Sequence, residues 1–257
     1  MGINRKNIYR KSKLEVNDKL LKKDIQTVWK DNPAYGHRRL AWELGINPKR
    51  TLRVMNKFGI KPPRRKTKKH WCTVSTDHHS YTNLIKDLKA SQPHQAWSSD
   101  LSYIKLQGSF WYLATIEDIC TRQVMAAQVG KHHDSDLVLT TIKQAIKLAI
   151  PKYFHCDQGT EFMAKRCTDY LEKYGVCISV SDAGSPWQNG YQESFFGRFK
   201  EEFGDFNRFD HVGELIEEIY SQIYYYNFKR RHTAFKVSPV EFAVSKYSDY
   251  CLHKRGA

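Results

Sequence analysis

Three carboxylates, Asp100, Asp157 and Glu193, occupy sequence contexts that would suit a shared metal site. Asp100 lies in the run 97–104, where period-2 alternation and a bias to β-branched and aromatic residues predict a half-buried strand. A strand is a rigid support for a reactive group. The sequence therefore places the first carboxylate on a rigid element of the fold.

The other two carboxylates lie at the ends of predicted elements. Asp157 closes a short strand over 153–156 and precedes Gly159 and Thr160, where we expect a turn and then a helix capped by Thr160. Glu193 lies in a predicted helix over 190–203 that follows a stretch rich in helix breakers. Between Asp157 and Glu193 the chain has 35 residues.

Hard oxygen ligands of this kind suit Mg²⁺, which keeps several waters and takes only one or two carboxylates per ion. Two such ions about 4 Å apart would hold the attacking and the leaving oxygen of a phosphodiester in line. The alternative is coincidence, because the chain has 27 Asp and Glu and most such residues are solvated. Local context favours the metal site over coincidence.

The three contexts together resemble the DDE triad of the retroviral integrase superfamily. Trp97 to Ile104 is similar to the first motif of bacterial insertion-sequence transposases of the insertion-sequence-three type, and Tyr226 to Pro239 is similar to their C-terminal motif. Tyr35 to Arg39 resembles the entry to their helix-turn-helix. The departures are small: Ser99 and Ser102 stand where Thr is usual, and Cys156 where Ser or Thr is usual.

The resemblance implies nicking at the ends of a mobile element and joining of those ends to target DNA through a 3′-hydroxyl. It implies duplex DNA partners (terminal inverted repeats and target), a homodimer or higher oligomer, and an upstream-frame fusion or partner. Two Mg²⁺ ions, for which Mn²⁺ can substitute, would be bridged by Asp100, while Asp157 and Glu193 each complete one shell. Arg231 and His232 are candidate contacts to the donor end through the resemblance alone.

Charge divides the chain into two parts. Residues 1–70 hold 21 Lys and Arg against 5 Asp and Glu, a net charge of +16, whereas residues 71–257 are close to neutral. This asymmetry predicts a separate N-terminal module that binds a polyanion, most plausibly duplex DNA. The six cysteines include no Cys-x-x-Cys pair, which argues against structural zinc, and the chain shows no membrane span or signal segment, so we expect a cytoplasmic protein.

The N-terminal module is predicted to be helical. Apolar residues at helical spacing predict a helix over 15–31, and further helices are expected over 37–44 and 48–58, ended by Gly45 and Gly59. Two helices joined at a short turn form a helix-turn-helix, in which Leu52, Met55 and Phe58 would face the core. Its candidate DNA-binding residues are Arg38, Arg39, Lys49, Arg50, Arg53, Asn56 and Lys57. A merely solvated basic face is the competing interpretation for each of them.

The basic segment 61–70 is predicted to be a linker. It can lie along DNA phosphates without sequence preference, and its candidate contacts are Arg64, Arg65, Lys66, Lys68 and Lys69. A short helix is expected over 81–89. The predicted domains are a helix-turn-helix domain (1–60), a linker region (61–92), the catalytic core (93–205) and a C-terminal helical extension (206–257).

The core is predicted as three meandering strands over 97–104, 110–118 and 123–129, followed by helix 134–149, strand 153–156, helix 160–174, strand 177–180 and helix 190–203. The fold class is α/β, an RNase H-like mixed sheet with the all-α N-terminal domain. Another helix is expected over 211–226, whose tyrosines would be core, dimer surface or base-stacking groups.

Three polar residues near the carboxylates are further candidates, and two of them have a structural alternative. Lys200 is two helical turns from Glu193 on the same face and would reach the DNA backbone. Asn189 either orients a ligand or DNA or caps the helix, and His155 either points into the site or is structural. Two rival functions are an RNase H-like nuclease for RNA/DNA hybrids, which usually has a fourth acidic ligand, and a sequence-specific DNA-binding protein with a non-catalytic integrase-like domain.

Overall fold

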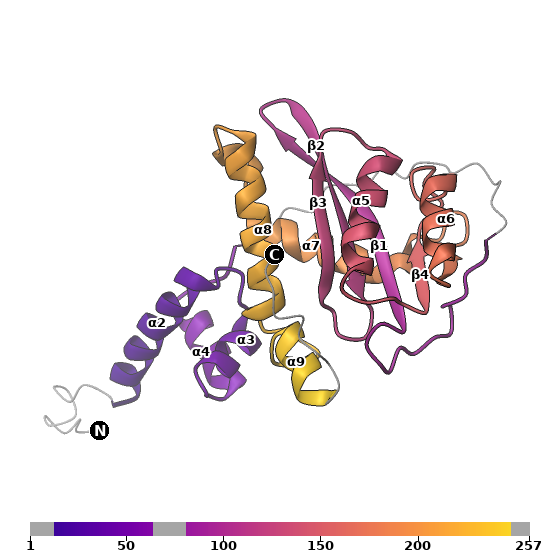
Figure 1. Ribbon diagram of the computed structural model, residues 1–257. Coiled ribbons are helices and arrows are strands. Elements are labelled where there is room, and N and C mark those ends of the chain that lie inside the picture. Colours follow the sequence, from indigo (N-terminus) through magenta and orange to yellow (C-terminus); the bar gives the residue numbers. More distant parts are fainter. Residues whose placement is uncertain (1–12, 64–80, 248–257) are drawn as a thin grey trace, which may run out of the picture. The chain divides into compact units, whose positions relative to one another are not determined.

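The computed structural model describes residues 13–63 and 81–247, and the chain divides into two compact units, residues 1–67 and 68–257 (Figure 1). The predicted DNA-contacting residues of the linker, Arg64, Arg65, Lys66, Lys68 and Lys69, lie outside the described residues. No helix within the described ranges is long and apolar enough to cross a membrane.

Within residues 13–63 the first unit has three helices, α2 (Lys13–Asp31), α3 (His37–Glu43) and α4 (Pro48–Lys57), close to their predicted positions. Gly45 ends the second helix at a φ of 62°, a left-handed conformation that glycine adopts without steric cost. Asn47 caps α4, because its side chain accepts a hydrogen bond from the backbone N–H of Lys49 at 2.8 Å. The small core of this unit is formed by Leu21, Ile25, Tyr35, Leu40, Val54 and Met55.

The predicted inner face of α4 needs one correction. Leu52 was expected in the core, yet it is 40% exposed, whereas Thr51 and Val54 are buried. Met55 is buried as predicted, and Phe58 packs at the edge of the core. The buried face is thus rotated slightly around the helix axis from the expected one.

The second unit contains a five-stranded sheet with the order β3-β2-β1-β4-β5. Its antiparallel part is the meander β1 (Ala96–Leu106), β2 (Ser109–Asp118) and β3 (Val124–Gly130). The two short strands β4 (Tyr153–Cys156) and β5 (Cys177–Val180) continue the sheet in parallel with β1. This is the predicted mixed sheet, and β1 lies at its centre.

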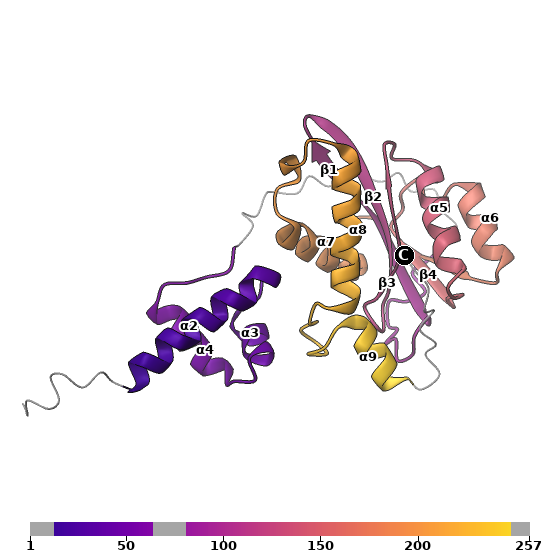
Figure 2. The same ribbon diagram turned by 60° about the vertical axis from the view of Figure 1, so that its left-hand side comes forward.

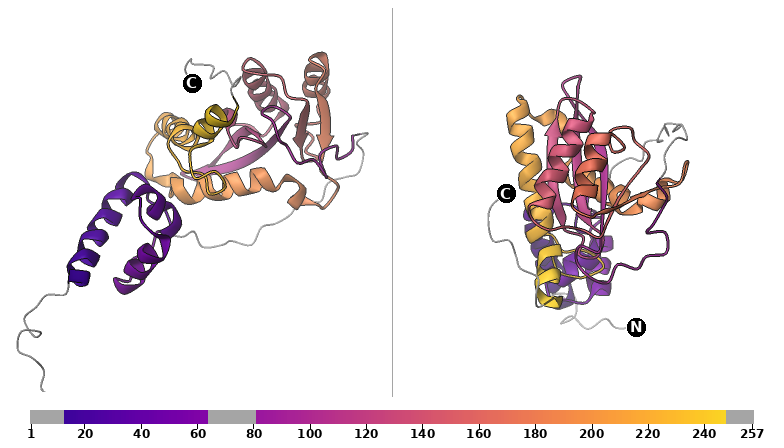
Figure 3. Two further views of the ribbon diagram at one scale, coloured as in Figure 1. Left: turned by 90° about the horizontal axis from the view of Figure 1, so that it is seen from below. Right: turned by 45° about the vertical axis from the view of Figure 1, so that its right-hand side comes forward.

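Helices cover both faces of this sheet (Figure 2). α5 (Ser135–Ile146) and α6 (Lys165–Lys173) lie on one face, whereas α7 (Gly190–Phe203) and α8 (Val212–Phe228) lie on the other, as the views in Figure 3 also show. The short helices η1 (Pro186–Asn189) and η2 (Phe206–Arg208) flank α7, and α9 (Pro239–Lys246) follows α8.

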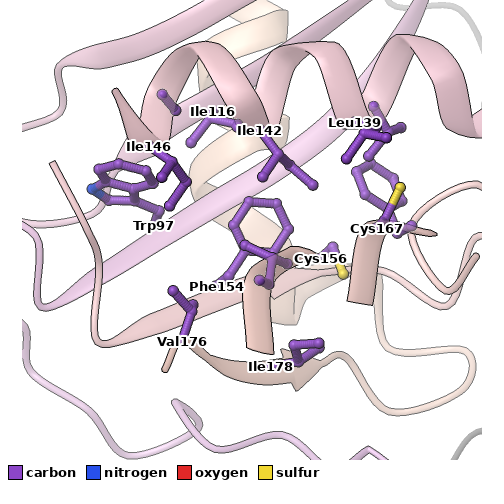
Figure 4. Packing of buried hydrophobic residues seen from close by; sticks show 14 of the residues in the cluster. Trp97, Ile116, Leu139, Ile142, Ile146, Phe154, Cys156, Cys167, Val176 and Ile178 are labelled. Atoms are coloured by element: carbon purple, nitrogen blue, oxygen red, sulfur yellow. The ribbon is translucent and has the colours of Figure 1, made fainter. Parts of the chain in front are cut away.

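Side chains of β1 point alternately to the two faces of the sheet and contribute to a hydrophobic core on each face. Trp97 packs with Phe154 and Ile142 under α5 and α6 (Figure 4), whereas Ile104 packs with Phe199 and other residues of α7 and α8 on the opposite face. Successive side chains of a strand point to opposite faces. Even-numbered residues of β1, Asp100 among them, therefore face α7.

Two predicted helices differ from the structure. Residues 81–89 form turns, and the backbone of this segment bonds to β5, because the N–H of Val180 donates to the carbonyl of Thr82 at 3.1 Å. α6 begins at Lys165 with Ala164 at its N-cap, so Thr160 does not cap it. The segment between Asp157 and α6 is a loop.

Candidate active site

Asp100 lies on β1, and Asp157 directly follows β4, the strand that pairs with β1 in parallel. Ser98 of β1 pairs with His155 of β4, and each aspartate lies two residues further along its own chain. A step of two residues also keeps both side chains on the same face of the pleat. The expectation that these two carboxylates would be neighbours in the sheet is therefore confirmed by the strand register.

The electrostatics of Asp100 reflect this proximity. Burial and then the negative charge of Asp157 raise the pKa of Asp100 to about 7, and Glu161 adds to the shift. The backbone N–H of Leu101, which donates to Asp100 at 2.8 Å, and the ammonium group of Lys200 act in the opposite direction. Such a pair repels itself unless a proton or a cation lies between its members.

Asp157 is held by its own turn. Its Oδ1 accepts a hydrogen bond from the backbone N–H of Gly159 at 3.0 Å, the geometry of an Asx turn. Loss of surrounding water raises the pKa of Asp157, while this hydrogen bond lowers it. The turn directs the chain away from the sheet and leaves the carboxylate accessible to solvent.

Glu193 is brought to the same face by contacts between α7 and β1. The side-chain amide of Gln192 donates to the carbonyl of Ser98 at 2.6 Å, and its Oε1 accepts from the hydroxyl of Thr115, the cross-strand partner of Asp100, at 2.9 Å. Glu193 is the next residue and is exposed. Gln192 thus anchors α7 beside Asp100, and Glu193 is the residue that follows this anchor.

Asn189 and Lys200 flank Glu193 on α7. Asn189 occupies the N-cap position without a side-chain cap bond, and its Nδ2 donates instead to the carbonyl of Ser99 at 3.1 Å. The capping interpretation of Asn189 is therefore wrong. Lys200 donates to the carbonyl of Tyr103 at 3.2 Å and lies over the ring of Tyr103, so this lysine also ties α7 to β1.

Glu161 is a carboxylate near this pair that sequence reasoning missed. Its charge raises the pKa of Asp100, and Nε2 of His133 lies 3.4 Å from its Oε1. The sequence gives one signal, an acidic residue four positions after Asp157, which is hidden if a helix is assumed to begin at Thr160. Because the helix begins later, the loop folds Glu161 back towards the two aspartates.

The geometry stops short of a complete metal site. Across residues 13–63 and 81–247, no three His, Cys, Asp or Glu side chains converge closely enough to hold an ion. The structure brings Asp100 and Asp157 together and carries Glu193 on the adjoining helix. These are hard oxygen donors of the type that Mg²⁺ prefers.

His155 has a structural role. Its Nδ1 lies 2.9 Å from the hydroxyl of Ser179 and its Nε2 lies 3.0 Å from that of Ser181, so both ring nitrogens are used inside the sheet. Burial lowers the pKa of His155 to about 4, so the ring is neutral at physiological pH. Of the two interpretations of this histidine, the structural one is confirmed.

Two predicted DNA contacts of the helix-turn-helix are engaged within the first unit. Arg53 and Lys57 both bond to Asp18 of α2, which is fully buried, with 2.8 Å between the Lys57 ammonium and the carboxylate. Lys49, Arg50, Asn56 and Arg38 are exposed, whereas Arg39 donates to the carbonyl of Ala34 and lies over the ring of Tyr35. Arg53 and Lys57 stay 43% and 40% exposed, so the face of α4 is not narrowed, but the Asp18 carboxylate offsets part of its positive charge.

The C-terminal motif has one buried and two more accessible polar groups. Arg230 and Glu202 form an ion pair at 2.7 Å with side chains only 4% and 6% exposed. Arg231 donates to the carbonyl of Lys236 at 3.0 Å, and the His232 ring lies against Phe235. The motif therefore stabilises the loop between α8 and α9, and the predicted DNA contacts of Arg231 and His232 stay predictions.

Comparison with known proteins gives consistent matches. Two models described as integrase core domain match residues 90–186 and 174–239. The transposase for insertion sequence element IS904 of Lactococcus lactis is 30% identical over 91% of this chain and 97% of its own length. An uncharacterized transposase-like protein of Haemophilus influenzae is 30% identical over 79% of this chain and 96% of its own length.

A solved structure has a similar fold. A chain of the simian T-cell lymphotropic virus intasome in complex with PP2A regulatory subunit B56 gamma superposes with a TM-score of 0.55 at 14% identity, covering 85% of this chain and 74% of that one. The likeness concerns the fold, the RNase H-like sheet with its flanking helices.

Proposed function

This chain belongs to the insertion-sequence transposases of the retroviral integrase superfamily, and on that basis we propose that it cuts DNA at the ends of a mobile element and joins those ends to a target. The observations that support this chemistry are the pairing of β1 with β4, the strand that Asp157 follows, and the raised pKa of Asp100, to which the charge of Asp157 contributes. The reaction is a transfer of a phosphoryl group between hydroxyl oxygens.

The acidic residues fit a hard divalent cation. Burial and then the charge of Asp157 raise the pKa of Asp100, and loss of surrounding water raises the pKa of Asp157, a cost that a cation removes. Mg²⁺ takes one or two carboxylates per ion, so Asp100 would be shared while Asp157 and Glu193 each serve one of two ions. When bound, Mg²⁺ (or Mn²⁺ in its place) activates the attacking hydroxyl and neutralises charge on the leaving oxygen.

The protein's own contribution is positioning. Gln192 and Asn189 hold α7 against β1 and so set the place of Glu193 relative to Asp100. The helix-turn-helix unit binds the terminal inverted repeats through Lys49 and Arg50, and two copies of the chain handle the two ends together.

The test uses the purified chain with labelled duplex DNA and Mg²⁺ or Mn²⁺. Asp100→Asn, Asp157→Asn and Glu193→Gln each abolish cleavage and strand joining while binding stays near wild type. Asp182→Asn is the matched control, because this carboxylate bonds to Gln188 in the loop before α7 and has no part in the proposed site. Retained cleavage in Glu193→Gln would remove that residue from the site.

Glu161 favours a second candidate, a nuclease for RNA/DNA hybrids, because such enzymes usually have a fourth carboxylate. The same assay separates the two functions when a hybrid substrate is added. Joined DNA products support transposition, and cleavage confined to the hybrid supports the nuclease. Binding without any cleavage would make the domain a non-catalytic DNA-binding module.

A further inference from the structure

The second unit contains a cavity of about 890 Å³ beside the start of α7. It is lined by the turn between β2 and β3, by α7 and by the segment after α8. Ser194, the residue after Glu193, lies in its wall. Ligand pockets in proteins are roughly 300–1,000 Å³, so the cavity has room for a nucleotide.

A buried carboxyl group without a partner lies in this cavity. Glu117 lines it and is only 2% exposed, and its Oε2 makes no hydrogen bond to any described residue. Burial raises the pKa of Glu117 to about 8, so at neutral pH the group offers one O–H donor and one acceptor. Buried polar groups nearly always have a partner, which indicates that the partner of Glu117 enters from outside the chain.

Aromatic rings line the same cavity. Trp187 lines the cavity and is 70% exposed, so its ring is accessible to a ligand. The ring of Tyr191 carries the guanidinium of Arg122 at 3.9 Å from its centroid. Flat rings of this kind stack on nucleobases without regard to sequence.

Cations surround the aromatic rings. Lys86, Arg122 and Arg198 line the cavity, and Asp87 is the exposed carboxylate among its lining residues. Arg122 has a φ of 62°, in the left-handed region that is unfavourable for a non-glycine residue.

We propose that this cavity binds one unpaired nucleotide of the DNA substrate, with Trp187 stacking on the base and Arg122 and Arg198 holding the adjoining phosphates. Glu117 contacts the edge of the base. This site rests on the proposed function, because the proposed reaction brings a DNA strand past Glu193 to Ser194, the next residue. It adds a site for a base that has left the duplex.

The experiment compares a blunt mixed-sequence duplex with the same duplex ending in one unpaired nucleotide, by fluorescence anisotropy without divalent metal. Wild type binds the frayed duplex more tightly. Trp187→Ala lowers that affinity roughly tenfold to a hundredfold, the usual contribution of a stacked base, and leaves the blunt duplex unchanged. Tyr224→Ala is the matched control, since this tyrosine is 51% exposed on α8 and does not line the cavity.

A second variant separates binding from folding. Arg122→Gly removes the cation together with the backbone strain. A lower affinity for the frayed duplex, with a melting temperature no lower than that of wild type, supports the proposal. An equal loss of affinity for both duplexes, or no loss of affinity in Trp187→Ala, overturns the proposal. Because no metal is present, this outcome is independent of catalysis: strand joining without discrimination between the duplexes refutes the cavity site and leaves the transposase function standing.

Discussion

Gln192 on α7 donates to the carbonyl of Ser98 on β1 at 2.6 Å, and this contact joins the helix that carries Glu193 to the strand that carries Asp100. Gln192 is fully buried and also accepts from the hydroxyl of Thr115. Its side chain therefore sets the position of the third carboxylate without being exposed to substrate.

Replacing Gln192 with Met keeps its length and removes both hydrogen bonds. We expect the single-turnover rate of cleavage at saturating DNA to fall by more than tenfold while the dissociation constant for DNA stays within twofold, because orientation and not binding is lost. Thr115→Val is the paired variant, since it breaks only one of the two bonds. A change confined to DNA affinity would contradict the positioning role.

Glu161→Gln tests whether the fourth carboxylate is a ligand. We place Glu161 outside the metal shell, so its loss should lower cleavage about tenfold to a hundredfold, as for outer-shell partners of metal ligands. His133→Gln, which removes the imidazole 3.4 Å from Glu161, should behave similarly. Complete loss, equal to that in Asp157→Asn, would make Glu161 a ligand.

The salt dependence of DNA binding distinguishes free from engaged cations. Lys49→Ala and Arg50→Ala should each reduce the slope of log affinity against log salt by about one, as expected for a phosphate contact. Arg53→Ala should change the slope less, because Asp18 already engages this guanidinium. Equal changes in the three variants would show that Arg53 leaves Asp18 when DNA binds.

Asp18 makes the stability of the first unit depend on pH. Hydrogen bonds from Arg53 and then Lys57 hold the pKa of Asp18 well below its ordinary value of 3.8. Its stabilisation is thus complete above that value and is lost as the pH falls towards the folded pKa. Asp18→Asn should melt earlier than wild type at pH 7, and the gap should narrow below about pH 4. A gap that stays constant down to pH 3 would contradict this.

The pair of Arg230 and Glu202 tests the C-terminal motif. Arg230→Met removes the guanidinium that pairs with the buried Glu202 carboxylate and should cost about 3–5 kcal/mol in the free energy of unfolding, measured by chemical denaturation. Adding Glu202→Leu should recover most of that loss, since the second charge is then gone as well. No recovery in the double variant would mean that packing of the arginine stem dominates.

The bounds of β4, β5 and α7 match the sequence predictions, because short apolar runs between turn residues leave few alternatives. The segment 81–89 was mispredicted because its backbone bonds are tertiary: the N–H of Leu84 donates to the hydroxyl of Ser179, ninety-five residues away. No local pattern in a sequence reports such a partner.

The candidate site shows the same division. Asp100 and Asp157 follow from strand pattern and strand ends. Glu161 was missed because its role depends on where α6 begins, and the engagement of Arg53 by Asp18 depends on how two helices pack. Features set by one segment were predictable, whereas features set by contact between distant segments were not.

The register of β1 and β4 has a consequence for divergence among relatives. Neighbouring strands lie about 4.8 Å apart whatever the connections between them, so the pairing of β1 with β4 holds the end of β4, which Asp157 follows, close to β1. Connecting segments can lengthen, shorten or change composition over evolutionary time without moving the two carboxylates. Chains that share fewer than a third of their residues can accordingly preserve one reaction geometry.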